Sequence, residues 1–137
     1  MVIPSARAIN LATQQLKLRS LFPRARTRIQ RSELSWEADI TPTPLSEVYR
    51  VGLTYKLGEP PDVHVFSPKL ERLEKCPLPH VYKGEMLCLY LPRAGEWRAD
   101  KFLALTIVPW TSEWLANYEV WRATGGVWCG GGTSHPK

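Results

Sequence analysis

The sequence predicts an α+β domain in which helices pack on one face of an antiparallel sheet. Two observations lead to this prediction. Apolar residues recur at helical spacing near both ends of the chain, and three segments between them alternate apolar with polar residues. The chain has 137 residues, of which 44% are hydrophobic and six are Trp. Because such a chain can bury a real core, we expect a single domain over residues 1–137.

The first element is expected to be a helix that is capped by Ser5 and runs to about Phe22, where Pro23 stops it. The apolar residues expected to face the core lie at helical spacing: Ile9, Ala12, Leu16 and Leu21. The polar residues available for the outer face are Arg7, Gln14 and Lys17. An arginine-rich connector then leads to the sheet.

Alternation of apolar and polar residues predicts strands over residues 34–40, 49–57 and 63–66. The segments between them, TPTPLSE and GEPP, are short and rich in proline, as turns are. Three strands joined in order by short turns form an antiparallel meander. His64, in the third strand, is expected to face outward.

The segment over residues 67–86 has no regular pattern and contains three prolines. A short extended piece follows, in which Leu87, Leu89 and Leu91 alternate with Cys88 and Tyr90. This alternation places Cys88 on the side opposite the leucines, so that it need not be a core residue. The structural alternative is a buried cysteine, which is the commonest environment of a free thiol.

The last helix is predicted from aromatic and apolar residues at helical spacing: Trp110, Trp114, Leu115, Tyr118 and Trp121. We expect this stripe to lie in the core. The helix would end at Thr124, with Gly125 in the left-handed conformation that follows many helices. A glycine-rich tail completes the chain.

The composition narrows the functional classes. The three cysteines, Cys76, Cys88 and Cys129, are odd in number and widely spaced, which argues against a disulfide framework and a zinc site. No apolar run is long enough to span a membrane and no secretory core is visible, so we expect a cytoplasmic protein. The net charge is +5, and basic residues dominate the chain before Glu33. Such a region is a solvated surface, a phosphate-binding site or a site for an acidic partner.

The segment LPHVYKGEMLCLYLPRAGEW resembles the active-site segment of the ubiquitin-conjugating enzymes. The matching residues are Pro79, Gly84, the triplet Leu87-Cys88-Leu89 and Trp97. His80 stands where the family has its active-site Asn, at the same spacing from Cys88, and Leu78 replaces the family's His. The opening helix, the meander and the turn with Pro60-Pro61 also fit the family's pattern.

The last helix and the tail are similar to a bacterial subgroup of this family that occurs in CBASS antiphage operons. The spacing equals that of the subgroup, except for one extra residue before the histidine. The matching residues are Pro109, Trp110, Glu113, Trp114, Leu115, Tyr118, Glu119, Trp121, Thr124, Gly125, Trp128, Gly130 to Gly132 and His135. The resemblance implies a protein encoded beside a cGAS-like nucleotidyltransferase, whose C-terminus it joins to another molecule.

The resemblance implies that Cys88 carries an acyl group as a thioester and that His80 donates a hydrogen bond to the oxyanion, while His135 folds back beside the cysteine. Lys83, Arg93 and Arg98 would favour the thiolate. An activating partner would dock on the basic N-terminal helix. Neither cofactor nor metal is implied, and neither nucleic acid nor a membrane is expected as a partner.

Two alternatives stay open. The first is a catalytically silent member of the same fold that only binds a partner, since the family's Asn is absent at position 80. The second is a nucleic-acid-binding domain that uses the basic N-terminal quarter. Its aromatic residues lie at core spacing instead of between the basic residues, which argues against this second alternative.

Overall fold

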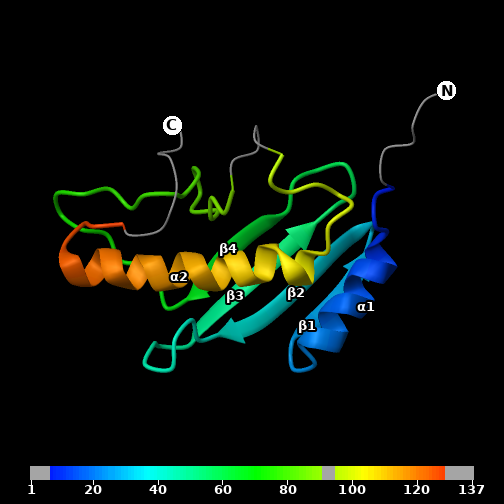
Figure 1. The fold of residues 1–137 in the computed structure, drawn as a ribbon, viewed down its shortest axis with the longest axis horizontal. Helices are drawn as coiled ribbons and strands as arrows, with labels where there is room; N and C mark the ends of the chain where they lie inside the picture. Colours follow the sequence, from blue (N-terminus) through cyan, green and yellow to red (C-terminus); the bar gives the residue numbers. More distant parts are fainter. Residues whose placement is uncertain (1–6, 91–94, 129–137) are drawn as a thin grey trace.

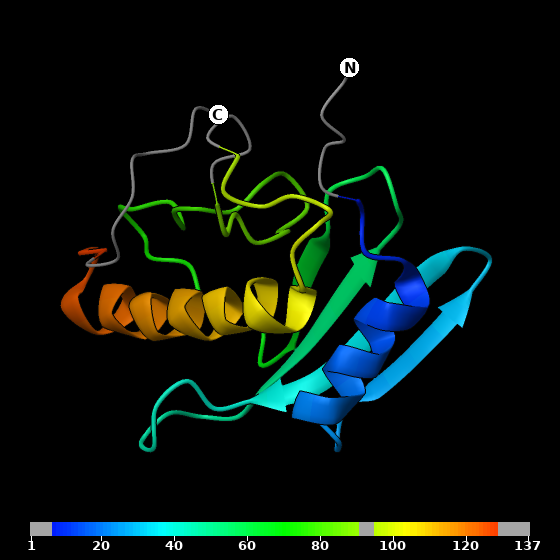
Figure 2. The same ribbon diagram turned by 45° about the vertical axis from the view of Figure 1, so that its right-hand side comes forward.

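A computed structural model describes residues 7–90 and 95–128 of the chain. It shows a four-stranded antiparallel sheet with two α-helices on one face, α1 (Leu11–Leu21) near one edge and α2 (Ile107–Thr124) across the sheet (Figures 1 and 2). The α+β architecture predicted from the sequence is confirmed. Neither described helix is long and apolar enough to cross a membrane.

Helix α1 begins later than expected and turns a different face to the core. Asn10 caps it by accepting a hydrogen bond from the backbone N–H of Thr13 at 2.8 Å, whereas Ser5 lies outside the described residues. Gln14 is fully buried, but Leu16 is 67% exposed, so the predicted inner and outer faces were wrong here. Leu18 supplies the main apolar contact with the core.

The sheet has the strand order β1-β2-β3-β4, so each strand pairs with its neighbour in sequence. The strands are β1 (Arg26–Gln30), β2 (Glu33–Ile40), β3 (Tyr49–Tyr55) and β4 (Asp62–Ser67). The last three confirm the predicted meander, although β3 is shorter than predicted. Strand β1 replaces the expected connector; it was missed because an edge strand exposed on most sides carries no apolar alternation.

The sheet buries the alternate residues of its strands against the helices. Trp36 of β2 is paired with Leu53 of β3, which is paired in turn with Val63 of β4, and all three side chains are buried. His64 points to the other face, as predicted, where it lines a shallow hollow with Phe66. The core therefore lies between one sheet face and the helices.

Helix α2 starts at Ile107, earlier than the predicted Trp110, and follows a short 3-10 helix, η2 (Leu103–Leu105). It ends at Thr124, and Gly125 has the left-handed conformation, with φ of 76°, that the sequence predicted. The predicted aromatic stripe is buried at Trp114, Leu115, Tyr118 and Trp121.

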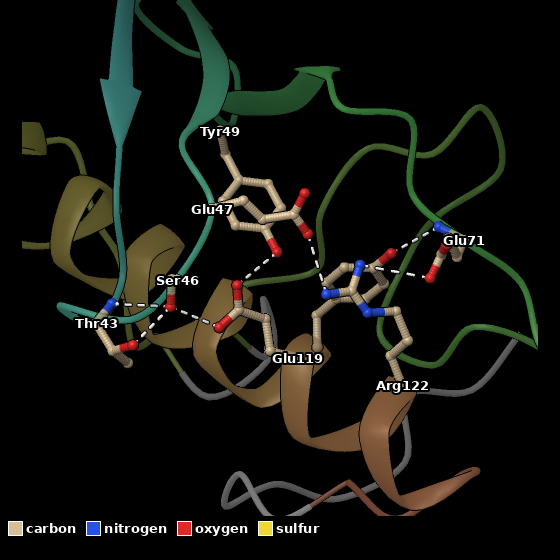
Figure 3. A network of polar contacts seen from close by, with 8 residues as sticks. Thr43, Ser46, Glu47, Tyr49, Glu71, Glu119 and Arg122 are labelled. Carbon is tan, nitrogen blue, oxygen red and sulfur yellow. Dashed lines mark hydrogen bonds and ion pairs between the residues drawn. The ribbon is translucent and has the colours of Figure 1, made fainter.

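A polar network holds the C-terminal half of α2 against the loop between β2 and β3 (Figure 3). Glu119 accepts hydrogen bonds from the hydroxyls of Ser46 at 2.6 Å and Tyr49 at 2.7 Å. One turn later, Arg122 forms an ion pair with Glu47 at 3.0 Å. These contacts fix the helix relative to the sheet, and the same helix reaches the cysteine-bearing segment.

Candidate active site

The segment before Cys88 is a tight hairpin. Val81 and Leu87 form an antiparallel bridge, and the N–H of Tyr82 donates to the carbonyl of Met86 at 2.8 Å. Gly84 has a φ of 86°, which a residue with a side chain rarely adopts, and it allows the chain to reverse within so few residues. A segment that looked irregular in sequence thus has a defined local structure.

The hairpin brings the backbones of His80 and Cys88 together. The Cys88 N–H donates to the His80 carbonyl at 2.9 Å, and the indole N–H of Trp114 on α2 donates to the same oxygen at 3.0 Å. The N–H of Leu87 donates to the Val63 carbonyl of β4 at 2.9 Å. The cysteine backbone is therefore tied to both the helix and the sheet.

The backbone conformation at position 80 favours particular residue types. His80 has a φ of 55°, and histidine, like asparagine and aspartate, is enriched among side-chain-bearing residues in this left-handed region. Its ring lies 4.9 Å from the ring of Trp128, with a tilt of 42° between them. The proposed donation from the His80 ring to an oxyanion stays a prediction.

Cys88 is only 4% exposed, and Leu87 beside it is 5% exposed. Cys88 is therefore buried, as in the structural alternative, although it is not part of the main apolar core cluster. The reason is that this short segment is covered on both sides, so alternate residues do not divide into core and solvent. The Cys88 sulfur lies 3.8 Å from the carbonyl oxygen of Tyr90, to which the thiol donates.

The environment of Cys88 raises the pKa of its thiol. Burial is the largest cause, and the negative charge of Glu96 adds to it, whereas hydrogen bonds with the Tyr82 hydroxyl and the Tyr90 backbone act in the opposite direction. The expected increase in thiolate from nearby cations is thus not what the structure gives. Arg98 is instead paired with Asp100 at 3.2 Å.

The segment between the cysteine-bearing hairpin and α2 is held by the N-terminal helix, α1. Gln14 of α1 donates to the Lys101 carbonyl and accepts from the Leu103 N–H, each at 2.9 Å. Trp97, predicted from the resemblance, donates to the Thr106 hydroxyl at 3.1 Å. Sequence reasoning missed the role of Gln14, since a glutamine in a helix is usually a surface residue.

Two residues expected near the site, His135 and Arg93, lie outside the described residues, and so does Cys129. Arg26 and Arg28 lie on β1 and Arg24 lies in the turn before it, so the basic region extends beyond the helix where a partner was expected. Within residues 7–90 and 95–128, no three His, Cys, Asp or Glu side chains gather as metal ligands.

Comparison with known proteins gives one family. The family model described as Type II CBASS E2 protein matches residues 14–136, which include the cysteine-bearing hairpin and all of α2. No curated protein matches the chain. Because the match covers most of the sequence, the chain belongs to the type II CBASS E2 protein family and is a bacterial, CBASS-associated E2-like protein.

Proposed function

We propose that this protein is a conjugating acyltransferase that carries the C-terminus of another protein as a thioester on Cys88 and passes it to an acceptor. The observation that carries the proposal is the fixed position of Cys88 at the end of a hairpin that is tied to both β4 and α2. Membership of an E2 family supports the same chemistry.

The reaction requires two transfers. In the first, the Cys88 thiolate attacks the carbonyl carbon of an activated C-terminus, a C–S bond forms, and the activating group leaves with its electron pair. In the second, an amine attacks the thioester carbon, a C–N bond forms and the thiolate leaves, while the amine proton passes to water. A thioester is already activated, so no strong general base is needed.

The burial of Cys88 suits a carrier that must keep its thioester from water. It also sets a condition on loading, since Cys88 as a residue is 4% exposed and its thiol must become accessible before an activated carbonyl can reach it. The raised pKa of the thiol means that little thiolate is present at neutral pH. Loading should therefore speed up as the pH rises, because the thiolate is the attacking species.

His80 is the proposed oxyanion donor, and His135 of the tail is a further candidate for the site. His80 is placed by two hydrogen bonds to its carbonyl, which fix its backbone beside that of Cys88. An imidazole N–H can stabilise the oxygen of a tetrahedral intermediate as an asparagine amide does.

The protein carried is proposed to be a cGAS-like nucleotidyltransferase with a free C-terminus. The conjugation reaction is proposed to take place in the cytoplasm. A separate activating partner is proposed to dock on the basic region of α1 and β1. We also propose that residues 1–137 form one domain.

Mass spectrometry of the protein purified with its operon neighbours tests the proposal. We expect an adduct on Cys88 that a thiol reductant removes. The Cys88→Ser variant should retain the carried protein as an oxyester or lose transfer, whereas Cys76→Ser, at the other described free cysteine, should behave as the wild type. Normal transfer by the folded fraction of an otherwise unfolded Cys88→Ser variant would show that Cys88 is a core residue.

The burial and raised pKa of Cys88 also favour a second function, that of a catalytically silent binding module. A silent module would show no adduct under any condition, and Cys88→Ser would protect cells from phage as well as the wild type does. A protection assay with both proteins therefore separates the two functions.

A further inference from the structure

The alternation of side chains along the hairpin places Tyr82 beside Cys88. Val81 is paired with Leu87, so these two side chains point to one face of the hairpin. Tyr82 and Cys88, the next residue on each strand, point to the other. They are diagonal neighbours across the ladder, and a side chain as long as tyrosine spans the roughly 7–8 Å between such positions.

The pKa values of the two groups reflect this proximity. The Tyr82 hydroxyl lowers the pKa of Cys88, and the Cys88 thiol raises the pKa of Tyr82, as expected where a hydroxyl can donate to a thiolate. Burial, the first cause of the raised pKa of Tyr82, keeps its proton in place throughout the neutral range. Tyr82 is 41% exposed, so it also reaches the surface from a site whose sulfur does not.

We propose that Tyr82 is a further residue of the active site, whose hydroxyl holds the Cys88 thiolate when the thioester forms and again when the thiolate leaves. This inference rests on the proposed thioester function of Cys88. The Tyr90 backbone also favours the thiolate, but its position is fixed by the main chain and no side-chain substitution removes it. Donation by the Tyr82 hydroxyl becomes stronger on ionisation, because its acceptor then carries a charge.

Other ionisable groups lie near the Cys88 sulfur, and a variant that tests Tyr82 must leave them unchanged. Glu96 opposes ionisation by its charge, and the Tyr90 hydroxyl lies close enough to sense the thiolate. His80 stands at the start of the same hairpin, where its carbonyl accepts from the Cys88 N–H. The Tyr82→Phe variant leaves all of them in place, since it removes a single oxygen from a partly exposed ring. Tyr90→Phe is the matched control, because it removes a hydroxyl that does not bond to the sulfur.

The test is the pH dependence of labelling by iodoacetamide, followed by mass spectrometry of the peptide that contains Cys88. A hydrogen bond to a charged group typically changes an equilibrium about tenfold or more. We therefore expect Tyr82→Phe to slow labelling at neutral pH by about tenfold, which corresponds to an upward shift of about one pH unit in the profile. The rates of the two proteins should converge at high pH, and Tyr90→Phe should follow the wild type.

Labelling needs no activated partner, so its result is independent of the search for a thioester. An unchanged pH profile in Tyr82→Phe overturns the inference even if the Cys88 adduct is found. Absence of labelling at every pH in both proteins also overturns it, since the thiolate then never forms. A shifted profile without any adduct would support the hydrogen bond and count against the proposed function instead.

Discussion

Replacing Gln14 with leucine should destabilise the protein far more than a helix glutamine normally would. Gln14 is fully buried, and its amide satisfies the Lys101 carbonyl and the Leu103 N–H, each at 2.9 Å. Leucine has a similar size but leaves both backbone groups without this partner. Each unsatisfied buried group costs about 1–3 kcal/mol, so we expect a loss of about 2–4 kcal/mol, allowing for the partial exposure of Lys101.

Urea denaturation followed by tryptophan fluorescence measures this loss. With an m-value of roughly 2 kcal/mol per molar urea, the midpoint should fall by about 1–2 M. The matched control is Gln15→Leu on the same helix, because the Gln15 side chain donates one weak hydrogen bond of 3.3 Å to the Thr27 hydroxyl within the described part of the chain. A surface substitution of this kind usually changes stability by about 0.5 kcal/mol. Equal losses in the two variants would refute the reasoning.

The stability of the Gln14→Glu variant should depend on pH for the same structural reason. A carboxylate can still accept from the Leu103 N–H but offers no proton to the Lys101 carbonyl, whereas a protonated carboxyl can. Burial also raises the folded-state pKa of such a group above its unfolded value of about 4.3. Its stabilising contribution is therefore present at low pH and lost as the pH rises through the folded-state pKa. A variant with no such dependence, relative to the wild type, would count against the geometry.

The remaining predictions concern transfer, partner binding and alkaline stability. His80→Ala should slow discharge of a preloaded thioester by about a hundredfold, whereas His80→Asn should retain activity because asparagine suits the left-handed backbone; an unchanged single-turnover rate in His80→Ala would end the oxyanion proposal. Reversal of Arg24, Arg26 and Arg28 to Glu should slow loading in a salt-sensitive way, whereas tight, salt-dependent binding of nucleic acid by the wild type would favour the nucleic-acid function. The pKa of Tyr49 is raised by burial and by the carboxylate that it contacts, so stability should fall as the pH rises above about 10, and Tyr49→Phe should flatten this fall in urea titrations.

The parts of the fold that could be predicted from sequence depend on contacts within one element or between neighbours. The meander followed from alternation, and the end of α2 followed from Gly125 after a helical stripe. The position of Gln14 could not be predicted, since its partners are 87 and 89 residues away and nothing local shows that two backbone groups need an amide. Strand β1 was missed because it is mostly exposed and contains a single apolar residue, Ile29, so it shows no apolar alternation.

The candidate site was predictable in part. The spacing of His80 and Cys88 pointed to a common site, and the structure does pair their backbones. The burial of Cys88 could not be foreseen, because local alternation does not show that Leu87 and Cys88, which point to opposite sides, are both covered by the rest of the chain. Tyr82 was missed, although a signal existed: a turn at Gly84 gives positions 82 and 88 the same side of a hairpin.

The order of the strands has a consequence for how the protein assembles. Each strand pairs with its neighbour in sequence, so the sheet can form while the chain is being synthesised, with only short loops to close. The bond from Trp114 to the His80 carbonyl spans 34 residues and cannot form until α2 has emerged. We therefore expect the sheet to form before the cysteine-bearing hairpin is anchored, and the His80 carbonyl to gain its second hydrogen bond only when α2 is complete.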